Sequence, residues 1–102
     1  MKIFYKTSGN TYYIRFINRI TGYVWDDVAE AMGVASSVTW ANSVVEVSEV
    51  GESGQYPIVL PTDLPKGATY DAVLYLQAGA SPLNTDQVDE VYQLKYGSTF
   101  GF

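Results

Sequence analysis

Two groups of closely spaced carboxylates are the residues in this sequence best suited to chemistry. They comprise Asp26, Asp27 and Glu30 in the first group, and Asp86, Asp89 and Glu90 in the second. Oxygen ligands gathered in one loop could bind Ca²⁺, but the second segment, "NTDQVDE", lacks the alternating acids and the turn-forming Gly of an EF-hand. A carboxylate pair could also hydrolyse a glycosidic bond, but only at a fixed separation in a cleft. Because eleven acids always supply some pair, we expect solvated acidic loops and no metal site.

Other kinds of catalysis have few residues available. The sequence contains no His, which is the commonest general base and metal ligand, and no Cys for a nucleophile, a disulfide or a thiolate site. It also lacks a phosphate-binding loop and a dinucleotide-binding glycine motif. We therefore predict that the protein is not an enzyme, with no catalytic residue and no cofactor.

Aromatic residues are the unusual part of the composition, with nine Tyr, four Phe and two Trp. Such side chains fill the cores of β-sandwiches, act as anchors in protein interfaces, or stack on sugars. All three uses remain open for Tyr12, Tyr13, Tyr23, Trp25, Trp40 and Tyr75. The sequence ends in "YGSTFGF", in which two Phe would gain by burial, either in their own core or in a neighbouring protein. We predict partner contacts at Tyr13, Tyr75, Phe100 and Phe102.

Charge is distributed unevenly along the chain. Residues 1–25 hold Lys2, Lys6, Arg15 and Arg19 and no acid, whereas the remainder holds all eleven acids, and the net charge is −5. An acidic chain with so few bases is a poor nucleic-acid binder. The asymmetry reflects either chance placement or contact between one subunit's basic edge and a neighbour's acidic surface. No apolar stretch reaches the length of a membrane span or of a secretory signal. We therefore expect that the protein is made in the cytoplasm and does not associate with a membrane.

Seven short segments alternate apolar and polar residues in the manner of β-strands. They span residues 2–6, 11–18, 23–25, 40–50, 55–60, 69–79 and 88–96. Residues 26–36 instead predict a helix of one or two turns, capped by Asp26 or Asp27, with an irregular loop as the alternative. The pattern predicts an all-β fold, a single antiparallel sandwich domain over residues 1–102 with at most one short helix. A small barrel or jelly roll is the alternative.

The two most regular strands also predict which side chains are buried. In the first, Tyr12, Ile14 and Phe16 would face one side, and Tyr13, Arg15 and Ile17 the other. In the second, Leu74 and Leu76 should lie in the core. Pro57 cannot donate a hydrogen bond to a neighbouring strand, so its strand should lie at an edge.

The segment "LPTDLPKG", residues 60–67, predicts a corner between two strands. Pro61 and Pro65 end the preceding strand and stiffen the chain. Gly67 permits a positive φ before the next strand begins. We expect Tyr70 to lean back over this corner, as in the tyrosine corner of immunoglobulin-like domains.

The order of motifs from Gly54 to Asp86 is itself distinctive. A Gly-Xaa-Tyr element, the corner "LPTDLPKG", a Tyr on the following strand, "LQAGASP" and an Asp follow one another, and "ITGYVWDD" lies upstream. This order resembles a family of small immunoglobulin-like β-sandwich proteins from the structural genes of tailed phages. The resemblance covers roughly residues 20–90, and it leaves out the insert at 26–36 and the final "YGSTFGF".

The resemblance implies an immunoglobulin-like sandwich and a role in the virion. Such a protein would be a non-enzymatic structural component, either capsid decoration (cement) or part of the neck or tail. Its partners would be other virion proteins, with a homo-oligomer left open, and it would be made in the host cytoplasm. The alternative is a carbohydrate- or receptor-binding module displayed on the particle.

Overall fold

Extended strands make up nearly all the regular structure of this chain. The computed structural model describes residues 2–35 and 40–97. The elements in chain order are β1 (Ile3–Tyr5), β2 (Tyr12–Asn18), β3 (Val24–Asp26), β4 (Ala31–Gly33), the 3₁₀ helix η1 (Trp40–Ser43), β5 (Val45–Val47), β6 (Gln55–Pro57), β7 (Ala68–Leu76) and β8 (Gln87–Tyr96). The predicted all-β fold class is confirmed.

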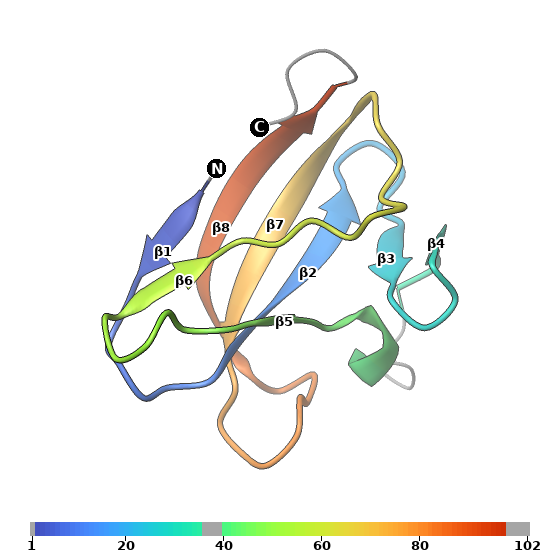
Figure 1. Cartoon of the computed structure of the whole chain (residues 1–102). Helices are drawn as coiled ribbons and strands as arrows, with labels where there is room; N and C mark the ends of the chain where they lie inside the picture. The colour runs from blue at the N-terminus through green and yellow to red at the C-terminus, as the bar shows by residue number, and fades with distance from the viewer. Residues whose placement is uncertain (1, 36–39, 98–102) are drawn as a thin grey trace.

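The strands form two antiparallel sheets of very different size. The larger has the order β4-β3-β2-β7-β8, with β5 also paired to β2, and the smaller contains only β1 and β6. Figure 1 shows β1 and β6 lying in front of the larger sheet. The arrangement is sandwich-like, although its division into six and two strands differs from the four and three of an immunoglobulin constant domain.

The main core lies between the two sheets. Phe4 and Tyr56 of the small sheet pack with Ile14, Phe16 and Leu74 of the large one, and each is at most 1% exposed. Side chains of β2 and β7 alternate between the two faces of the large sheet as predicted. The two strands pair in an unbroken register from Tyr12–Leu76 to Asn18–Tyr70, so their core-facing side chains lie side by side. The expected burial of Leu74 is confirmed, while Leu76 is only partly buried at the margin of this core.

The predicted helix at residues 26–36 is wrong. Residues 24–33 form a hairpin in which β3 pairs with β4, with Trp25 opposite Met32. The Asp26 carboxylate does act like a helix cap, accepting hydrogen bonds from the N–H groups of Val28 and Ala29 at 2.9 Å. However, Glu30 adopts a left-handed φ of 56°, which reverses the chain into β4 instead of continuing a helix.

The predicted corner is confirmed in detail. Gly67 has a φ of 83°, and the Tyr70 hydroxyl donates a hydrogen bond of 2.5 Å to the backbone oxygen of Pro65. Tyr70 itself is fully buried. Pro57 ends β6, which pairs only with β1 among the described residues, in agreement with the predicted edge position.

Candidate functional site

A second apolar cluster lies on the face of the large sheet that points away from the main core. Tyr13 of β2 and Tyr75 of β7 stack with ring centroids 5.1 Å apart, and Trp40 of η1 meets Tyr75 edge-on at 5.3 Å. Val73 packs against them. We call Tyr13, Arg15, Trp40 and Tyr75 the outer aromatic cluster. It buries part of the outer face of the large sheet, over β2 and β7, although the outer face of a sandwich sheet is commonly exposed to solvent.

Arg15 is the cation at the centre of the outer aromatic cluster. It is 5% exposed, and its guanidinium lies 3.7 Å above the ring of Trp40. Its Nε donates to Ser43 Oγ at 2.8 Å and its Nη1 to the Tyr75 hydroxyl at 3.3 Å. No ion pair to Arg15 occurs within residues 2–35 and 40–97. Aromatic faces and neutral acceptors therefore hold this charge, and they fasten η1 to the sheet.

Asp86 anchors the loop between β7 and β8 to the same cluster. Its carboxylate accepts hydrogen bonds from the Tyr13 hydroxyl at 2.7 Å, from Leu83 N–H at 2.9 Å and from Ala78 N–H at 3.2 Å. Burial on its own would raise the pKa of Asp86, but these three donors outweigh it and hold the pKa below its usual value. Burial, together with the bond to Asp86, raises the pKa of Tyr13.

This geometry bears directly on the predicted partner contacts. Tyr13 is 1% and Tyr75 7% exposed, so both rings are engaged inside the chain and leave little surface for a partner. Tyr13 and Tyr75 were predicted as partner contacts because aromatic side chains often act as anchors in interfaces, but the β7–β8 loop and η1 cover the face on which they lie. Phe100 and Phe102 lie outside the described residues.

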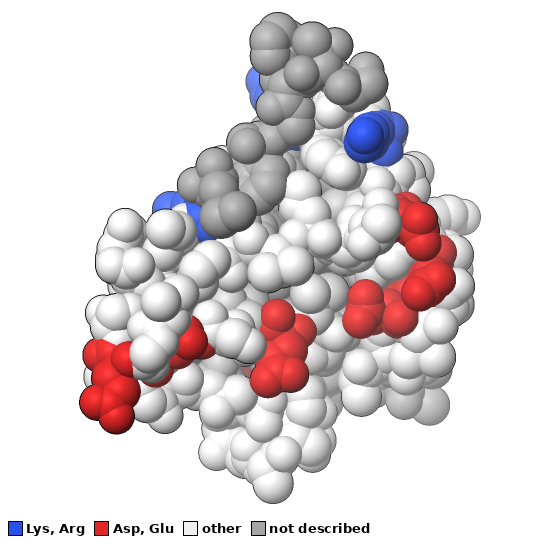
Figure 2. Space-filling model, in the orientation of Figure 1, with Lys and Arg blue, Asp and Glu red and all other residues white. Residues whose placement is uncertain are grey.

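Ion pairs within the chain account for much of the charge asymmetry. Lys6 Nζ lies 2.8 Å from Glu90 and 3.0 Å from Asp89, and Lys2 Nζ lies 3.6 Å from Glu90. Arg19 pairs with Asp71 at 3.4 Å. Acidic side chains on the face seen in Figure 2 occur in separate groups rather than in one continuous patch. Three of the four basic residues near the start of the sequence therefore form ion pairs with acids on β7 and β8 of the same chain.

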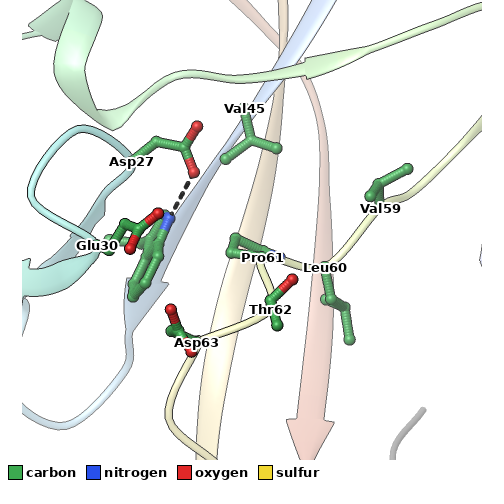
Figure 3. A pocket seen from close by; sticks show the side chains of 9 residues that line it. Asp27, Glu30, Val45, Val59, Leu60, Pro61, Thr62 and Asp63 are labelled. Carbon is green, nitrogen blue, oxygen red and sulfur yellow. Dashed lines mark hydrogen bonds between the residues drawn. The ribbon is translucent and has the colours of Figure 1, made fainter.

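A hollow next to the corner lies between the β3–β4 turn and residues 59–63. Its volume is about 310 Å³. Val45, Val59, Leu60 and Pro61 supply apolar walls, and Asp27, Glu30 and Asp63 supply carboxylates (Figure 3). We call this hollow the corner pocket.

Trp25 limits what the corner pocket can bind. Its indole Nε1–H donates to the Asp27 carboxylate at 2.9 Å, the contact dashed in Figure 3. Trp25 is only 1% exposed, so it offers little of its ring for stacking on a sugar. The carboxylates could accept hydrogen bonds from hydroxyl or amino groups. Within the described residues, no group of three or more His, Cys, Asp or Glu side chains is placed to hold a metal ion.

The sequence did not predict that the residues of the outer aromatic cluster, or those of the corner pocket, lie next to one another. Asp27 and Glu30 were assigned to a helix, and Asp63 to a structural corner, and no local pattern links them. The other predicted acids have structural roles, since Asp26 closes a turn and Asp89 is bound by Lys6.

Comparisons with known proteins add no relative. No protein-family model, no curated protein and no solved structure matches this chain. Among the residues that the structure describes, no helix has the length and apolar character needed to cross a membrane.

Proposed function

We propose that this chain is a non-enzymatic structural protein of a tailed-phage virion. In this proposal it binds other virion proteins, either as a capsid decoration (cement) protein or as a component of the neck or tail. Its role would be mechanical: buried area shared between neighbouring proteins of the particle would strengthen the assembly. The outer aromatic cluster supports this role, because the polar groups of Tyr13, Arg15 and Asp86 hold η1 and the β7–β8 loop in place.

The observation that carries the proposal is the role of the residues that create the resemblance. Gly54 closes a turn with a φ of 75° and donates its N–H to Glu49 at 2.8 Å. Tyr70 bonds back to the corner, and Asp86 fastens the loop that contains "AGASP". These three motif residues therefore each fix a loop on a β-scaffold, which is how a family of sandwich proteins would preserve its fold while its surfaces adapt to different partners.

Binding to particles tests the proposal. Purified, fluorescently labelled protein would be mixed with particles of the encoding phage that lack it, and the particles would be sedimented and imaged. We expect saturable co-sedimentation and density at symmetry-related positions on the head, neck or tail. Failure to bind such particles, together with absence of the protein from purified wild-type virions, would refute a virion role.

The corner pocket favours a second candidate, a carbohydrate- or receptor-binding module displayed on the particle. Three carboxylates around a hollow of about 310 Å³ could accept hydrogen bonds from sugar hydroxyls. A glycan array tests this directly. Binding that Asp63→Ala abolishes, and that an exposed control such as Glu52→Ala leaves intact, would favour the module over the structural role.

A further inference from the structure

The strand β8 forms one edge of the large sheet. It pairs with β7 from Ala68–Tyr96 to Leu76–Gln87, and no strand within residues 2–35 and 40–97 pairs with its other side. Figure 1 shows β8 as a long strand at this margin. An edge of this length presents a row of backbone N–H and C=O groups to any chain that can adopt an extended conformation. The strand contains no Pro that would prevent such pairing.

Apolar side chains border this edge on the outer face of the sheet. Val88 is 48% and Val91 54% exposed. The register places Val88 opposite Tyr75 and Val91 opposite Val73, so these two valines extend the buried outer aromatic cluster to the surface. A strand added to β8 would cover both of them.

The charges of β8 fit a second copy of β8 in the antiparallel direction. The acids Asp89 and Glu90 lie in its first half and Lys95 in its second. Lys6 and Lys2 already pair with the two acids, which reduces repulsion between approaching copies. The register passes from Leu74–Glu90 to Tyr75–Val88, so Asp89 lies in a β-bulge, where it pairs with Lys6. With a two-fold axis at Tyr92, Lys95 of each copy approaches this acidic bulge of the other. A parallel pairing in register would instead place like charges side by side.

We propose that β8 is a self-association edge, at which a second copy of this chain pairs antiparallel through its own β8. The two large sheets then join into one continuous sheet across a two-fold axis near Tyr92. The contact is isologous and closes on itself, so it produces a dimer rather than a fibre. This association goes beyond the proposed function, because it depends only on the chain itself and not on any particle.

Sedimentation velocity over a concentration series up to about 1 mM, a range that includes weak association, tests the proposal. We expect a reversible monomer–dimer equilibrium. Val91→Lys adds a charge beside the edge and should weaken dimerisation at least tenfold. The matched control is Val28→Lys, a change at a 73% exposed valine in the β3–β4 turn, and it should leave the equilibrium unchanged. A strictly monomeric protein, or a dimer that Val91→Lys leaves intact, would overturn the proposal.

Cross-linking provides an independent measurement, because the sequence contains no Cys. With the axis at Tyr92, position 91 of one copy lies opposite position 93 of the other, within the Cα separation of about 4.4–6.8 Å that a disulfide requires. An equimolar mixture of Val91→Cys and Gln93→Cys should therefore form a mixed disulfide faster than either variant alone. Equal rates in the mixture and in a Val28→Cys control would contradict the antiparallel β8 contact, even if Val91→Lys proved poorly folded.

Discussion

The bond between Tyr13 and Asp86 gives the sharpest test of how the outer aromatic cluster stabilises the fold. Asp86→Asn preserves the size of the side chain but replaces one acceptor oxygen with an NH₂ group. The carboxylate accepts three hydrogen bonds, through Oδ1 from Ala78 and through Oδ2 from Leu83 and Tyr13. Asn loses at least one of these hydrogen bonds, because its NH₂ group would point at a backbone N–H, which is also a donor. Because hydrogen bonds to charged groups contribute about 1.5–3 kcal/mol, we expect the free energy of unfolding to fall by about 2–3 kcal/mol.

A double-mutant cycle isolates the contact between the two side chains. Tyr13→Phe removes the hydroxyl that donates to Asp86 and that accepts from Trp40 Nε1 at 3.1 Å. On its own it should cost about 1.5–3 kcal/mol, because it leaves the partly buried Trp40 N–H and the buried Asp86 carboxylate each short of a partner. The double variant should lose less than the sum of the single losses, with a coupling of about 1 kcal/mol.

The dependence of stability on pH follows from the direction of the Asp86 pKa shift. Its pKa is lower in the folded state than its ordinary value, so its contribution is fully present above the unfolded pKa of about 3.9 and is lost as the pH falls through the folded pKa. Wild-type stability should therefore decline below about pH 4, and Asp86→Asn should flatten this decline. Some slope will remain, because hydrogen bonds from Ser8 and from the Gly54 N–H also lower the pKa of Glu49.

Urea unfolding followed by far-ultraviolet circular dichroism measures these quantities at each pH. The free energies of the four members of the cycle would be compared at pH 7, and those of the wild type and Asp86→Asn from pH 7 to about pH 2.5, a range that spans the unfolded pKa. Strict additivity, or parallel pH profiles for the two proteins, would show that the Tyr13–Asp86 contact contributes nothing measurable.

Three further predictions concern the scaffold, each measured as a change in the free energy of unfolding. Leu74→Ala should cost about 2–5 kcal/mol, because Leu74 is fully buried in the main core; a loss below about 1 kcal/mol would contradict that packing. Gly54→Ala should cost more than Gly51→Ala, since both have a left-handed φ but only the new Cβ at 54 would lie 2.4 Å from the backbone oxygen of Lys6; equal losses would refute the clash. Tyr70→Phe should cost about 0.5–1.5 kcal/mol by removing the corner hydrogen bond, and an unchanged stability would show that the corner does not need it.

The parts of the fold that depend on local patterns could be predicted from the sequence. Each of the seven predicted strands overlaps a strand of the structure, and the faces of β2 and β7 alternate as expected. The predicted strand at 40–50 is wrong over residues 40–43, which form η1. The corner was also predictable, because Pro, Gly and Tyr act there over a few residues. The hairpin at 24–33 could not be predicted, because an Asp that accepts hydrogen bonds from the next N–H groups can begin either a turn or a helix. Only the left-handed Glu30 and the pairing with β3 decide between them.

The candidate sites depended on contacts between distant segments and were therefore harder to predict. Arg15 has the appearance of a surface residue in a strand, and its burial requires η1, which follows about 25 residues later in the chain. Tyr13 needs the β7–β8 loop for its partner Asp86. Arg15 and Tyr13 are buried because η1 and the β7–β8 loop cover the outer face of the large sheet. The alternation of residues along one strand does not indicate which loop will cover it.

The position of β2 in the large sheet also affects how the chain can fold during synthesis. Its residues pair with residues of β7 that lie 52 to 64 positions later, and its apolar side chains point to both faces. On the ribosome, β2 must therefore wait until most of the domain has been made before its principal partner emerges. At the usual speed of about 5–20 residues per second, the wait is several seconds. During that interval β3 and β5 can already pair with β2, but the edge of β2 that pairs with β7 stays open. Slower translation or the absence of chaperones should therefore favour aggregation over native protein.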